Sequence, residues 1–471
     1  MNTETAAKAW LESDKVDEAT KAEIRQMNEK QREDAFYRNL EFGTGGMRGL
    51  LGTGTNRMNL YTVRRATQGL FLALDEESRK KGIVIAYDTR HFSAEFAREA
   101  ARVLLANGAA VYLFDAPRAT PELSFAVRHL GAGAGIVITA SHNPKEYNGY
   151  KVYGEDGGQF PPKKSDRIFE AIEKLDLFSD VKLLPEEELS SHPAFHSISE
   201  DVDAAFLAAV KRQQIDPDVI AEQKDSLKVV YTPFHGAGKM PVLRILQEIG
   251  VKHVYPVEAQ CVPDGSFPTV KFPNPEVPES FAMATRLAKE KNCDLIIGTD
   301  PDCDRVGVMV RDQSGSYQVL TGNQTGALLC EYILSAKQRA GKLKADSAIV
   351  KTIVTTPLAD AVAKHYGVRV IDVLTGFKYI GEVIAGFEEN HDGTYEIGFE
   401  ESFGYLVGTH ARDKDAVVAV MLIVEMAASY RRRGMNLYEG LCELFERYGY
   451  FMEKTISLTM PGIDGMEKIL S

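Results

Sequence analysis

The sequence repeats one pattern of strand, helix and polar loop three times, and this repeat constrains the fold more than any other feature. The first copy begins with G-I-V-I-A-Y-D at 82–88, the second with L-K-V-V-Y-T-P-F from Leu227, and the third with A-I-V-K-T-I-V-T-T-P-L from Ala348. The helical stretch that follows each apolar run ends at a glycine, as helices commonly do: Gly108, Gly250 and Gly367. Strands that alternate with helices predict an α/β fold of parallel or mixed sheets with helices on both faces.

Start signals for these helices are also present. Ser93 is expected to cap the first helix at its N-terminus, and Thr356 to cap the third, with Pro357 as its first residue. Thr232-Pro233 occupies the same place in the second copy. A further helical region is expected over residues 5–40, ahead of the first copy.

Each copy ends in a polar loop that follows an apolar strand. The three loops are T-A-S-H-N-P at 139–144, G-T-D-P-D-C-D-R at 298–305 and G-F-E-E-S-F-G at 398–404. Ligands of open α/β sheets bind beyond the carboxyl ends of the strands, where such loops lie. We therefore predict three similar α/β/α domains with mixed sheets around a central cleft, each domain giving one loop to the cleft.

The repeat also sets the expected domain boundaries. A chain of 471 residues is long enough for about three domains. We place domain 1, with the serine loop, at 1–200, domain 2, with the aspartate loop, at 201–323, and domain 3, with the E-E-S loop, at 324–447. Residues 448–471 are expected to begin a fourth domain, of α+β type.

Composition excludes several classes of function. A net charge of −12 argues against non-specific nucleic-acid binding. No apolar run reaches transmembrane length, and the N-terminal residues 1–31 lack the apolar core of a signal peptide, so no membrane partner is expected. The five cysteines form no C-x-x-C pair, which favours a reducing, cytoplasmic location. The oligomeric state stays open.

Three aspartates in the second loop have the pattern of a metal site. Asp300, Asp302 and Asp304 alternate, so in an extended loop their carboxylates converge on one hard cation, which prefers oxygen ligands. A calcium loop of the helix–loop–helix kind is excluded, because Arg305 and Arg311 stand where that motif needs glycine and glutamate. The interpretation favours Mg²⁺ over a solvated acidic turn.

The metal site gives Ser141 a chemical role. A serine between a strand and Asn143-Pro144 would more often simply cap a turn. Beside a magnesium ion, however, Ser141 on an exposed loop is placed to carry a phosphoryl group. His142 next to it would orient a phosphate oxygen or carry a proton, or else be a hydrogen-bonded loop residue.

Other polar residues extend this interpretation. The glycine-rich stretch at 43–49 allows close backbone approach and directs Arg48 into the cleft. Lys151 and Lys378 are single lysines of the kind usually found on surfaces. Glu400 and Ser402, two apart on an extended loop, would point to the same side and grip adjacent sugar hydroxyls.

Together the three loops resemble those of the α-D-phosphohexomutase superfamily, over about Gly43 to Asp415. The opening G-T-G-G-M-R-G is similar to that of its phosphoglucomutase and phosphopentomutase branch. The resemblance implies reversible transfer between the 1- and 6-positions of glucose phosphate, through a phosphoserine and a bisphosphate. It also implies Mg²⁺ as cofactor and glucose 1,6-bisphosphate as activator.

The resemblance implies a role for each matched residue. Ser141 would be phosphorylated and would bind the metal together with the three aspartates. Arg48 and Lys151 would assist proton transfer. The phosphosugar substrate would be held by four residues: Arg305, Lys378, Glu400 and Ser402.

Two further points follow from the resemblance. Family members carry a fourth-domain loop of the form R-P-S-G-T-E-P-K, which holds the non-transferring phosphate, and these 471 residues contain no such stretch. The alternatives to a glucose enzyme are a phosphomannomutase, a phosphopentomutase or a non-catalytic phosphosugar-binding protein. An aspartyl phosphatase is disfavoured, because Asp304 stands where that class usually has threonine or valine.

Overall fold

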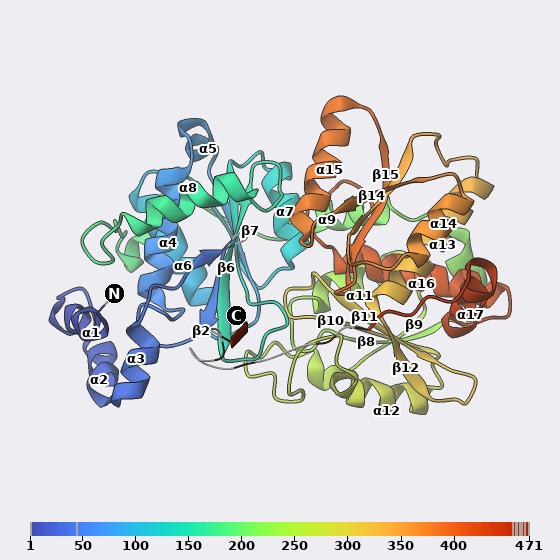
Figure 1. Ribbon diagram of the computed structural model, residues 1–471, viewed down its shortest axis with the longest axis horizontal. Helices are drawn as coiled ribbons and strands as arrows, with labels where there is room; N and C mark the ends of the chain where they lie inside the picture. Colours follow the sequence, from blue (N-terminus) through green and yellow to red (C-terminus); the bar gives the residue numbers. More distant parts are fainter. Residues whose placement is uncertain are drawn as a thin grey trace.

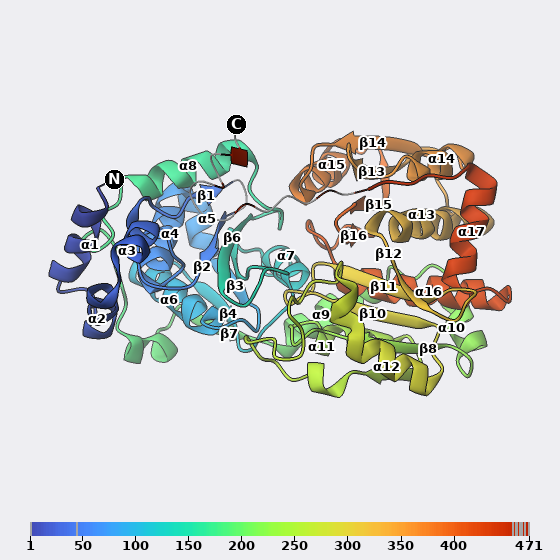
Figure 2. The ribbon, with the colours of Figure 1, turned by 60° about the horizontal axis from the view of Figure 1, so that its bottom comes forward.

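The computed structural model describes residues 2–43, 46–454, 456, 460, 465, 468 and 469. These residues form three mixed β-sheets with flanking helices, as the repeat predicts (Figure 1). The first sheet and its helices make up the left half of the molecule, and the second and third sheets lie in the right half (Figures 1 and 2). The expectation of three similar α/β/α domains is therefore confirmed.

The three sheets share one four-stranded core. Its order is β6-β5-β3-β4 in the first sheet, β11-β10-β8-β9 in the second and β16-β15-β13-β14 in the third. In each core the third strand in sequence pairs in parallel with the first and antiparallel with the fourth. The strands are β3 (Ile83–Tyr87), β4 (Val111–Phe114), β5 (Ala134–Ile138), β6 (Tyr147–Gly154), β8 (Lys228–Thr232), β9 (His253–Pro256), β10 (Leu295–Thr299), β11 (Val306–Arg311), β13 (Ser347–Thr352), β14 (Arg369–Val373), β15 (Thr394–Glu400) and β16 (Gly404–Leu406).

The connecting helices repeat in the same way. The helices between the first and second strands are α6 (Ser93–Ala106), α11 (Lys239–Glu248) and α14 (Leu358–His365), and those between the second and third strands are α7 (Thr120–His129), α12 (Ala282–Lys291) and α15 (Phe377–Asn390). Gly108, Gly250 and Gly367 each follow a helix with φ of 85°, 88° and 69°. These left-handed conformations suit glycine, so the predicted helix ends are correct.

The remaining elements extend the first and second sheets or cover the cores. The added strands are β1 (Phe42–Gly43), β2 (Gly46–Leu50), β7 (Phe195–Ile198) and β12 (Tyr317–Leu320). The added helices are α1 (Thr3–Glu12), α2 (Glu18–Gln26), α3 (Glu29–Phe36), α4 (Leu60–Ala73), α5 (Glu76–Lys81), α8 (Pro162–Glu173), α9 (Glu200–Lys211), α10 (Asp218–Gln223), α13 (Gly322–Arg339), α16 (Ala416–Arg432) and α17 (Leu437–Tyr448). The short 3₁₀ segments are η1 (Glu186–Ser191), η2 (Glu258–Gln260) and η3 (Pro278–Phe281).

The second and third domains share one hydrophobic core, which is built around α16. Residues 416–430 of this helix are all buried, and they pack against apolar residues of both sheets. Its one buried acid, Glu425, accepts hydrogen bonds from the backbone nitrogens of Ile215 and Asp216, at 2.9 and 3.0 Å, and from the Tyr332 hydroxyl at 2.7 Å. Domain 1 instead has separate cores on the two faces of its sheet.

Two of the predicted helix starts differ from the structure. Ser93 is the first helical residue rather than the cap, because its hydroxyl donates to the buried carboxylate of Asp88 at 2.7 Å. The cap position is taken by Phe92, whose φ is 65°. In the third helix Pro357 takes the cap position and the helix begins at Leu358, so Thr356 is not the cap residue, although its Oγ1 accepts from the Leu358 nitrogen at 3.1 Å.

The N-terminal end of the chain is helical, and the C-terminal end is described only in part. The helical region expected at 5–40 consists of α1, α2 and α3, in which Trp10, Ile24 and Phe36 are buried together. Much of the stretch 448–471 lies outside the described residues, including 457–459 and 461–464, so the predicted fourth domain stays a prediction. The boundaries at 200, 323 and 447 likewise stay predictions. Among the helices that the structure describes, none has the length and apolar character needed to cross a bilayer.

A buried acid in α7 leads to a prediction about stability. Glu122 is fully buried and lies 4.0 Å from Arg118, which is bound to Asp203 at 2.7 Å. Burial and the nearby Asp203 carboxylate raise the pKa of Glu122 well above 4.5. The folded state therefore holds a proton that the unfolded chain loses, and this group's contribution to stability falls as the pH rises above about 4.5.

We expect Glu122→Gln, which mimics the protonated acid, to remove this part of the pH dependence. Melting temperatures of the two proteins between pH 5 and pH 8 would measure it. The melting temperature of the variant should rise steadily relative to that of the wild type as the pH rises. If instead the melting temperature of the wild type rises relative to that of the variant over this pH range, Glu122 is ionised in the folded protein.

Candidate active site where three domain loops meet

The shared topology brings the three polar loops to equivalent places. Ser141 follows β5, Asp300 follows β10 and Glu400 ends β15, and these are the corresponding strands of the three cores. The loops meet: Ser141 Oγ donates to Asp300 Oδ2 at 2.6 Å, and Arg305 donates to the Ser402 carbonyl at 3.0 Å. Residues 159 positions apart therefore form one site.

Ser141 is buried in this arrangement, although we expected an exposed loop. Only 2% of the residue is exposed, because the aspartate loop of domain 2 covers it. Its φ of 51° is in the left-handed region, which is costly for a residue other than glycine. The serine is thus held in a fixed conformation beside a carboxylate.

His142 and Arg48 lie next to the serine. His142 Nδ1 is 3.2 Å from Ser141 Oγ, and burial, with the nearby Arg305 charge, lowers the pKa of His142 well below 6.5. Arg48 is exposed on β2 and donates to Asn143 Oδ1 at 3.0 Å. Because Arg48 pairs with Gly149 and Lys151 pairs with Gly46 across β2 and β6, Arg48 and Lys151 share one face of the sheet.

The three aspartates form a compact turn rather than an extended loop. The Cys303 nitrogen donates to the Asp300 carbonyl at 2.9 Å, and Asp300 Oδ1 accepts from the nitrogens of Asp304 and Arg305, at 3.1 and 3.0 Å. The turn, and not alternation along a strand, brings one oxygen of each carboxylate within 4.8 Å of the others. The prediction that they converge is confirmed, but its geometric reason was wrong.

The donor atoms of this cluster fit a hard divalent cation. All three carboxylates are buried, and Oδ1 of Asp302 and Oδ1 of Asp304 have no hydrogen-bond partner among the described residues. Burial and the two neighbouring carboxylates raise the pKa of Asp300 well above 3.8. Repulsion between buried carboxylates with unpaired oxygens is relieved when a cation binds them.

Two lysines from other domains compensate part of this charge. Lys151 Nζ lies 2.8 Å from Asp302 Oδ2 and 3.4 Å from Asp304 Oδ2, and Lys414 Nζ lies 3.2 Å from Asp304 Oδ2. Burial opposes ionisation of Asp304, but Lys414, Lys151 and Arg305 outweigh it and lower its pKa. Both lysines have a raised pKa, because the carboxylates outweigh their own burial.

The third loop contributes a buried carboxylate and a backbone carbonyl that binds Arg305. Glu400 is buried and accepts from the Gly376 nitrogen at 2.9 Å, and burial raises its pKa. Residues 401–403 form a turn, so the extended loop expected to align Glu400 with Ser402 is not observed. Lys378 lies in the first turn of α15, two residues beyond Gly376, with Nζ 5.0 Å from the Tyr379 ring centre.

The sequence does not reveal the contacts that three further residues make with the site. Lys414 binds Asp304, and the Thr120 hydroxyl donates to Asp302 Oδ2 at 2.8 Å. Arg90 donates to the backbone carbonyl of Ser141. The sequence signals for two of them are weak: D-T-R at 88–90 is a charged cluster directly after β3, and R-D-K-D at 412–415 is one between β16 and α16.

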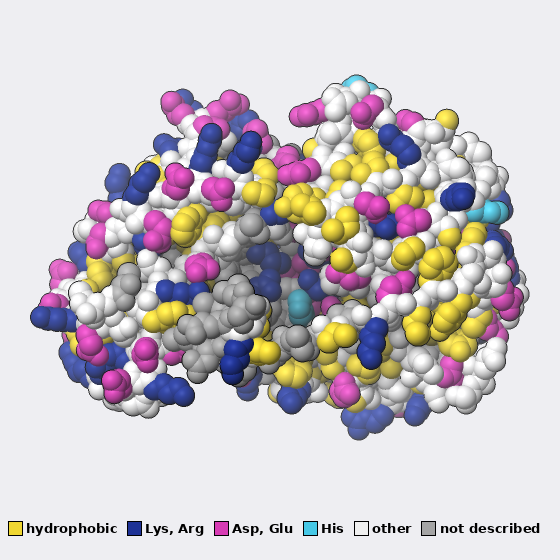
Figure 3. Space-filling model, in the orientation of Figure 1, with side chains coloured by type: hydrophobic (Ala, Val, Ile, Leu, Met, Phe, Trp, Pro, Cys, Tyr) yellow, Lys and Arg dark blue, Asp and Glu magenta, His cyan; other side chains and the backbone are white. Residues whose placement is uncertain are grey.

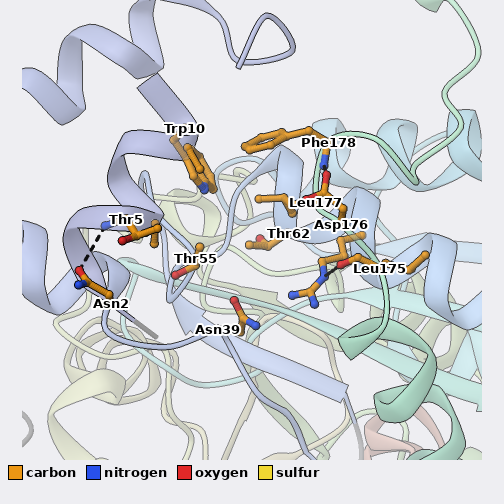
Figure 4. Close-up of a pocket in the computed structure, with 13 residues that line it drawn as sticks. Asn2, Thr5, Trp10, Asn39, Thr55, Thr62, Leu175, Asp176, Leu177 and Phe178 are labelled. Carbon is orange, nitrogen blue, oxygen red and sulfur yellow. Dashed lines mark hydrogen bonds between the residues drawn. The ribbon is translucent and has the colours of Figure 1, made fainter. Parts of the chain in front are cut away.

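The surface agrees with this location. Figure 3 shows lysine and arginine side chains gathered in a hollow between the two halves of the molecule. A separate cavity of about 330 Å³ lies between α1 and the rest of domain 1 and is lined by residues such as Trp10, Thr62 and Phe178 (Figure 4). None of the aspartate, serine or E-E-S loop residues lines that cavity, so it is not the candidate site.

Comparison with protein families gives three matches in order along the chain. The descriptions are phosphoglucomutase/phosphomannomutase α/β/α domain I for residues 39–178, domain II for 204–315 and domain III for 321–448. Each match contains one of the three site loops.

Individual proteins give the same result. A phosphoglucomutase of Staphylococcus aureus (strain MSSA476) is 36% identical over 464 residues, 98% of this chain and 81% of that protein. A phosphoglucomutase of Staphylococcus epidermidis (strain ATCC 35984) is 39% identical over 447 residues, 94% of this chain and 79% of that protein. A crystal structure of a provisionally assigned phosphomannomutase from Thermus thermophilus superimposes with a TM-score of 0.69 at 28% identity, covering 88% of this chain and 84% of that one.

The aspartate turn predicts binding of a divalent cation. Titration calorimetry with Mg²⁺ and with Mn²⁺ should show binding to the wild type. Asp302→Asn should weaken it at least about tenfold, since loss of even an outer partner of a metal ligand has that effect. Removing one of three repelling charges should leave the melting temperature of the metal-free protein nearly unchanged.

Glu290→Gln, an exposed change on α12 of the same domain, is the matched control and should bind the cation like the wild type. Equal affinity of Asp302→Asn and the wild type would place the cation elsewhere.

Proposed function

The chain belongs to the phosphoglucomutase/phosphomannomutase family of the α-D-phosphohexomutase superfamily, and we propose that it interconverts glucose 1-phosphate and glucose 6-phosphate. The single observation that carries the proposal is the 2.6 Å contact of Ser141 Oγ with Asp300 in the three-aspartate turn. It places a nucleophile beside a site suited to a cation, with basic side chains around both.

In this proposal Ser141 is the group that carries the phosphoryl group between turnovers. Mg²⁺, bound by Asp300, Asp302, Asp304 and an oxygen at Ser141, would neutralise charge on the transferring phosphoryl group. Lys151 and Arg48 lie on the same face of the sheet as each other, and both lie near the serine loop. Their cations would stabilise the phosphate oxygens, as phosphoryl transfer depends on positioning and charge stabilisation.

The proposed reaction has two transfers. In the first, a free sugar hydroxyl attacks phosphoserine; a bond from phosphorus to the sugar oxygen forms, the bond to Ser141 Oγ breaks, and the hydroxyl proton passes to a basic group of the site. The bisphosphate then reorients, and Oγ takes its other phosphoryl group in the reverse step. His142 is the proposed acceptor of this proton, because its lowered pKa keeps the ring neutral. Arg48 and Lys151 are proposed to assist the proton transfer as cations.

Substrate contacts are assigned to the third loop and to Arg305. Glu400 and Ser402 are proposed to hold the sugar hydroxyls, and Arg305 and Lys378 are proposed to contact the sugar phosphate. Arg305 already joins the loops of domains 2 and 3, because it donates to Glu276 at 3.3 Å and to the Ser402 carbonyl at 3.0 Å. From this position Arg305 would contact the substrate in both of the orientations that it takes during the two transfers.

The proposal includes glucose 1,6-bisphosphate as activator, since it would restore phosphate to an empty serine. It also includes a reducing, cytoplasmic location, which five unpaired cysteines support. The alternative substrates are mannose and pentose phosphates. Comparing kcat/KM for the glucose, mannose and ribose 1-phosphates would rank them.

The role of Ser141 predicts that Ser141→Ala abolishes turnover, because the change removes the only proposed nucleophile. The melting temperature should stay close to that of the wild type. The assay is coupled formation of glucose 6-phosphate from glucose 1-phosphate with Mg²⁺ and glucose 1,6-bisphosphate present.

Intact mass supplies an independent measurement. After incubation with glucose 1,6-bisphosphate, the wild type should gain one phosphate that resists hydroxylamine, and Ser141→Ala should gain none. Normal turnover by the alanine variant would contradict the proposal. A phosphate that hydroxylamine removes would indicate an aspartyl phosphate instead.

A further inference from the structure

Arg90 lies beneath the serine loop and binds four of its backbone carbonyls. One terminal nitrogen donates to the carbonyls of Ser141 and Asn143, and the other donates to those of Pro144 and Tyr147, the latter two at 2.8 and 3.1 Å. The first three carbonyls belong to the loop between β5 and β6, and Tyr147 is the first residue of β6. One buried guanidinium thus spans the whole loop that carries the nucleophile.

A buried ion pair with Asp88 fixes the arginine itself. Its Nε lies 3.2 Å from Asp88 Oδ2, and both side chains are fully buried. The same carboxylate oxygen accepts from the Thr139 hydroxyl at 2.7 Å, and Thr139 Oγ1 accepts from the Ser141 nitrogen at 2.8 Å. Ser141 is therefore held at its nitrogen through Asp88 and at its carbonyl by Arg90.

This double hold accounts for the conformation of Ser141. A φ of 51° is unfavourable for serine and persists only where surrounding groups impose it. Hydrogen bonds on both sides of the residue impose it here. In this conformation Ser141 Oγ points to Asp300 Oδ2, at 2.6 Å.

Domain 2 reaches the arginine on its other side. The ring of Phe267, only 2% exposed, lies with its centre 5.1 Å from the Arg90 guanidinium carbon. Beside it, His91 Nε2 lies 2.8 Å from Ser266 Oγ. The arginine that binds the serine loop is thus in contact with the domain that supplies the metal-binding turn.

We propose that Arg90 is a positioning residue for phosphoryl transfer: by binding the carbonyls of the serine loop it sets the conformation that aims Ser141 Oγ at the reacting phosphorus. Because the Phe267 ring packs on Arg90, the position of the arginine also depends on how domain 2 packs against domain 1. The inference rests on the proposed function of Ser141 as phosphate carrier.

Arg90→Lys is the principal test, because lysine keeps the positive charge beside Asp88 but lacks the planar fork that reaches four carbonyls. We expect kcat to fall about 100-fold, the usual effect of a small misplacement of reacting groups, with KM within about threefold of the wild type. After incubation with glucose 1,6-bisphosphate, intact mass should show Ser141 phosphorylated more slowly in the variant. Phe267→Leu, which keeps all four carbonyl bonds, should lower kcat less.

Arg79→Lys is the matched control. Arg79 also binds backbone carbonyls, of Phe71 and Leu72 at 2.8 and 2.7 Å, and its guanidinium carbon lies 4.8 Å from the Phe71 ring centre. It lies in domain 1 away from the serine loop, so the same change should leave kcat and phosphorylation at the wild-type level. Melting temperatures of all variants give the folded fraction at the assay temperature.

Three outcomes would overturn the proposal. The first is a kcat of Arg90→Lys within twofold of the wild type. The second is a loss of activity in Arg90→Lys that only matches its unfolded fraction. The third is a wild type that takes no phosphate at Ser141. The mass measurement separates this proposal from the choice of substrate. A wild type that is phosphorylated at Ser141 but does not turn over glucose 1-phosphate would contradict the proposed function alone, and the comparison of phosphorylation rates would still decide the role of Arg90.

Discussion

The repulsion among three buried carboxylates is the constraint on which the arrangement of the domains depends. Asp300, Asp302 and Asp304 are buried together, and such a cluster is stable only when positive groups surround it. Domain 2 carries the aspartates, whereas Lys151 comes from domain 1 and Lys414 from domain 3. Balancing this charge therefore requires all three domains to meet at one point, and that point is where the serine also lies.

The repeated topology explains how three separate domains meet this requirement. In each core the strand that carries the polar loop lies between a parallel and an antiparallel neighbour, so the loop leaves the same edge of each sheet. The loops themselves differ in chemistry between the copies: a serine in one, carboxylates in the next, and a carboxylate with a hydroxyl in the third. One scaffold used three times thus supplies nucleophile, cation ligands and polar binding groups.

The sequence was sufficient for the fold class and for the three loops, because local signals define them. Apolar runs, closing glycines such as Gly108 and the D-P-D-C-D run all depend on neighbours in sequence. Burial of Ser141 could not be predicted, because the group that covers it comes from 159 positions away. The ion pairs of Lys151 and Lys414 could not be predicted either, since nothing near them in sequence shows that they bind aspartates of domain 2. Lys151 had a role only through the resemblance to the family. For all three residues, the decisive information is the approach of another domain.

Several polar contacts join domain 1 to the rest of the molecule, beside apolar ones such as that of Phe125 with Phe206. Arg118 binds Asp203, Thr120 binds Asp302, and Arg128 donates to the carbonyls of the third domain at 409–410. Domains 2 and 3, in contrast, share the apolar core around α16. An interface of this mixed kind separates at lower cost than a core that two domains share, so relative motion is expected between domain 1 and the other two as a unit. Because the serine belongs to domain 1 and the aspartates to domain 2, such a motion would change the distance on which phosphoryl transfer depends.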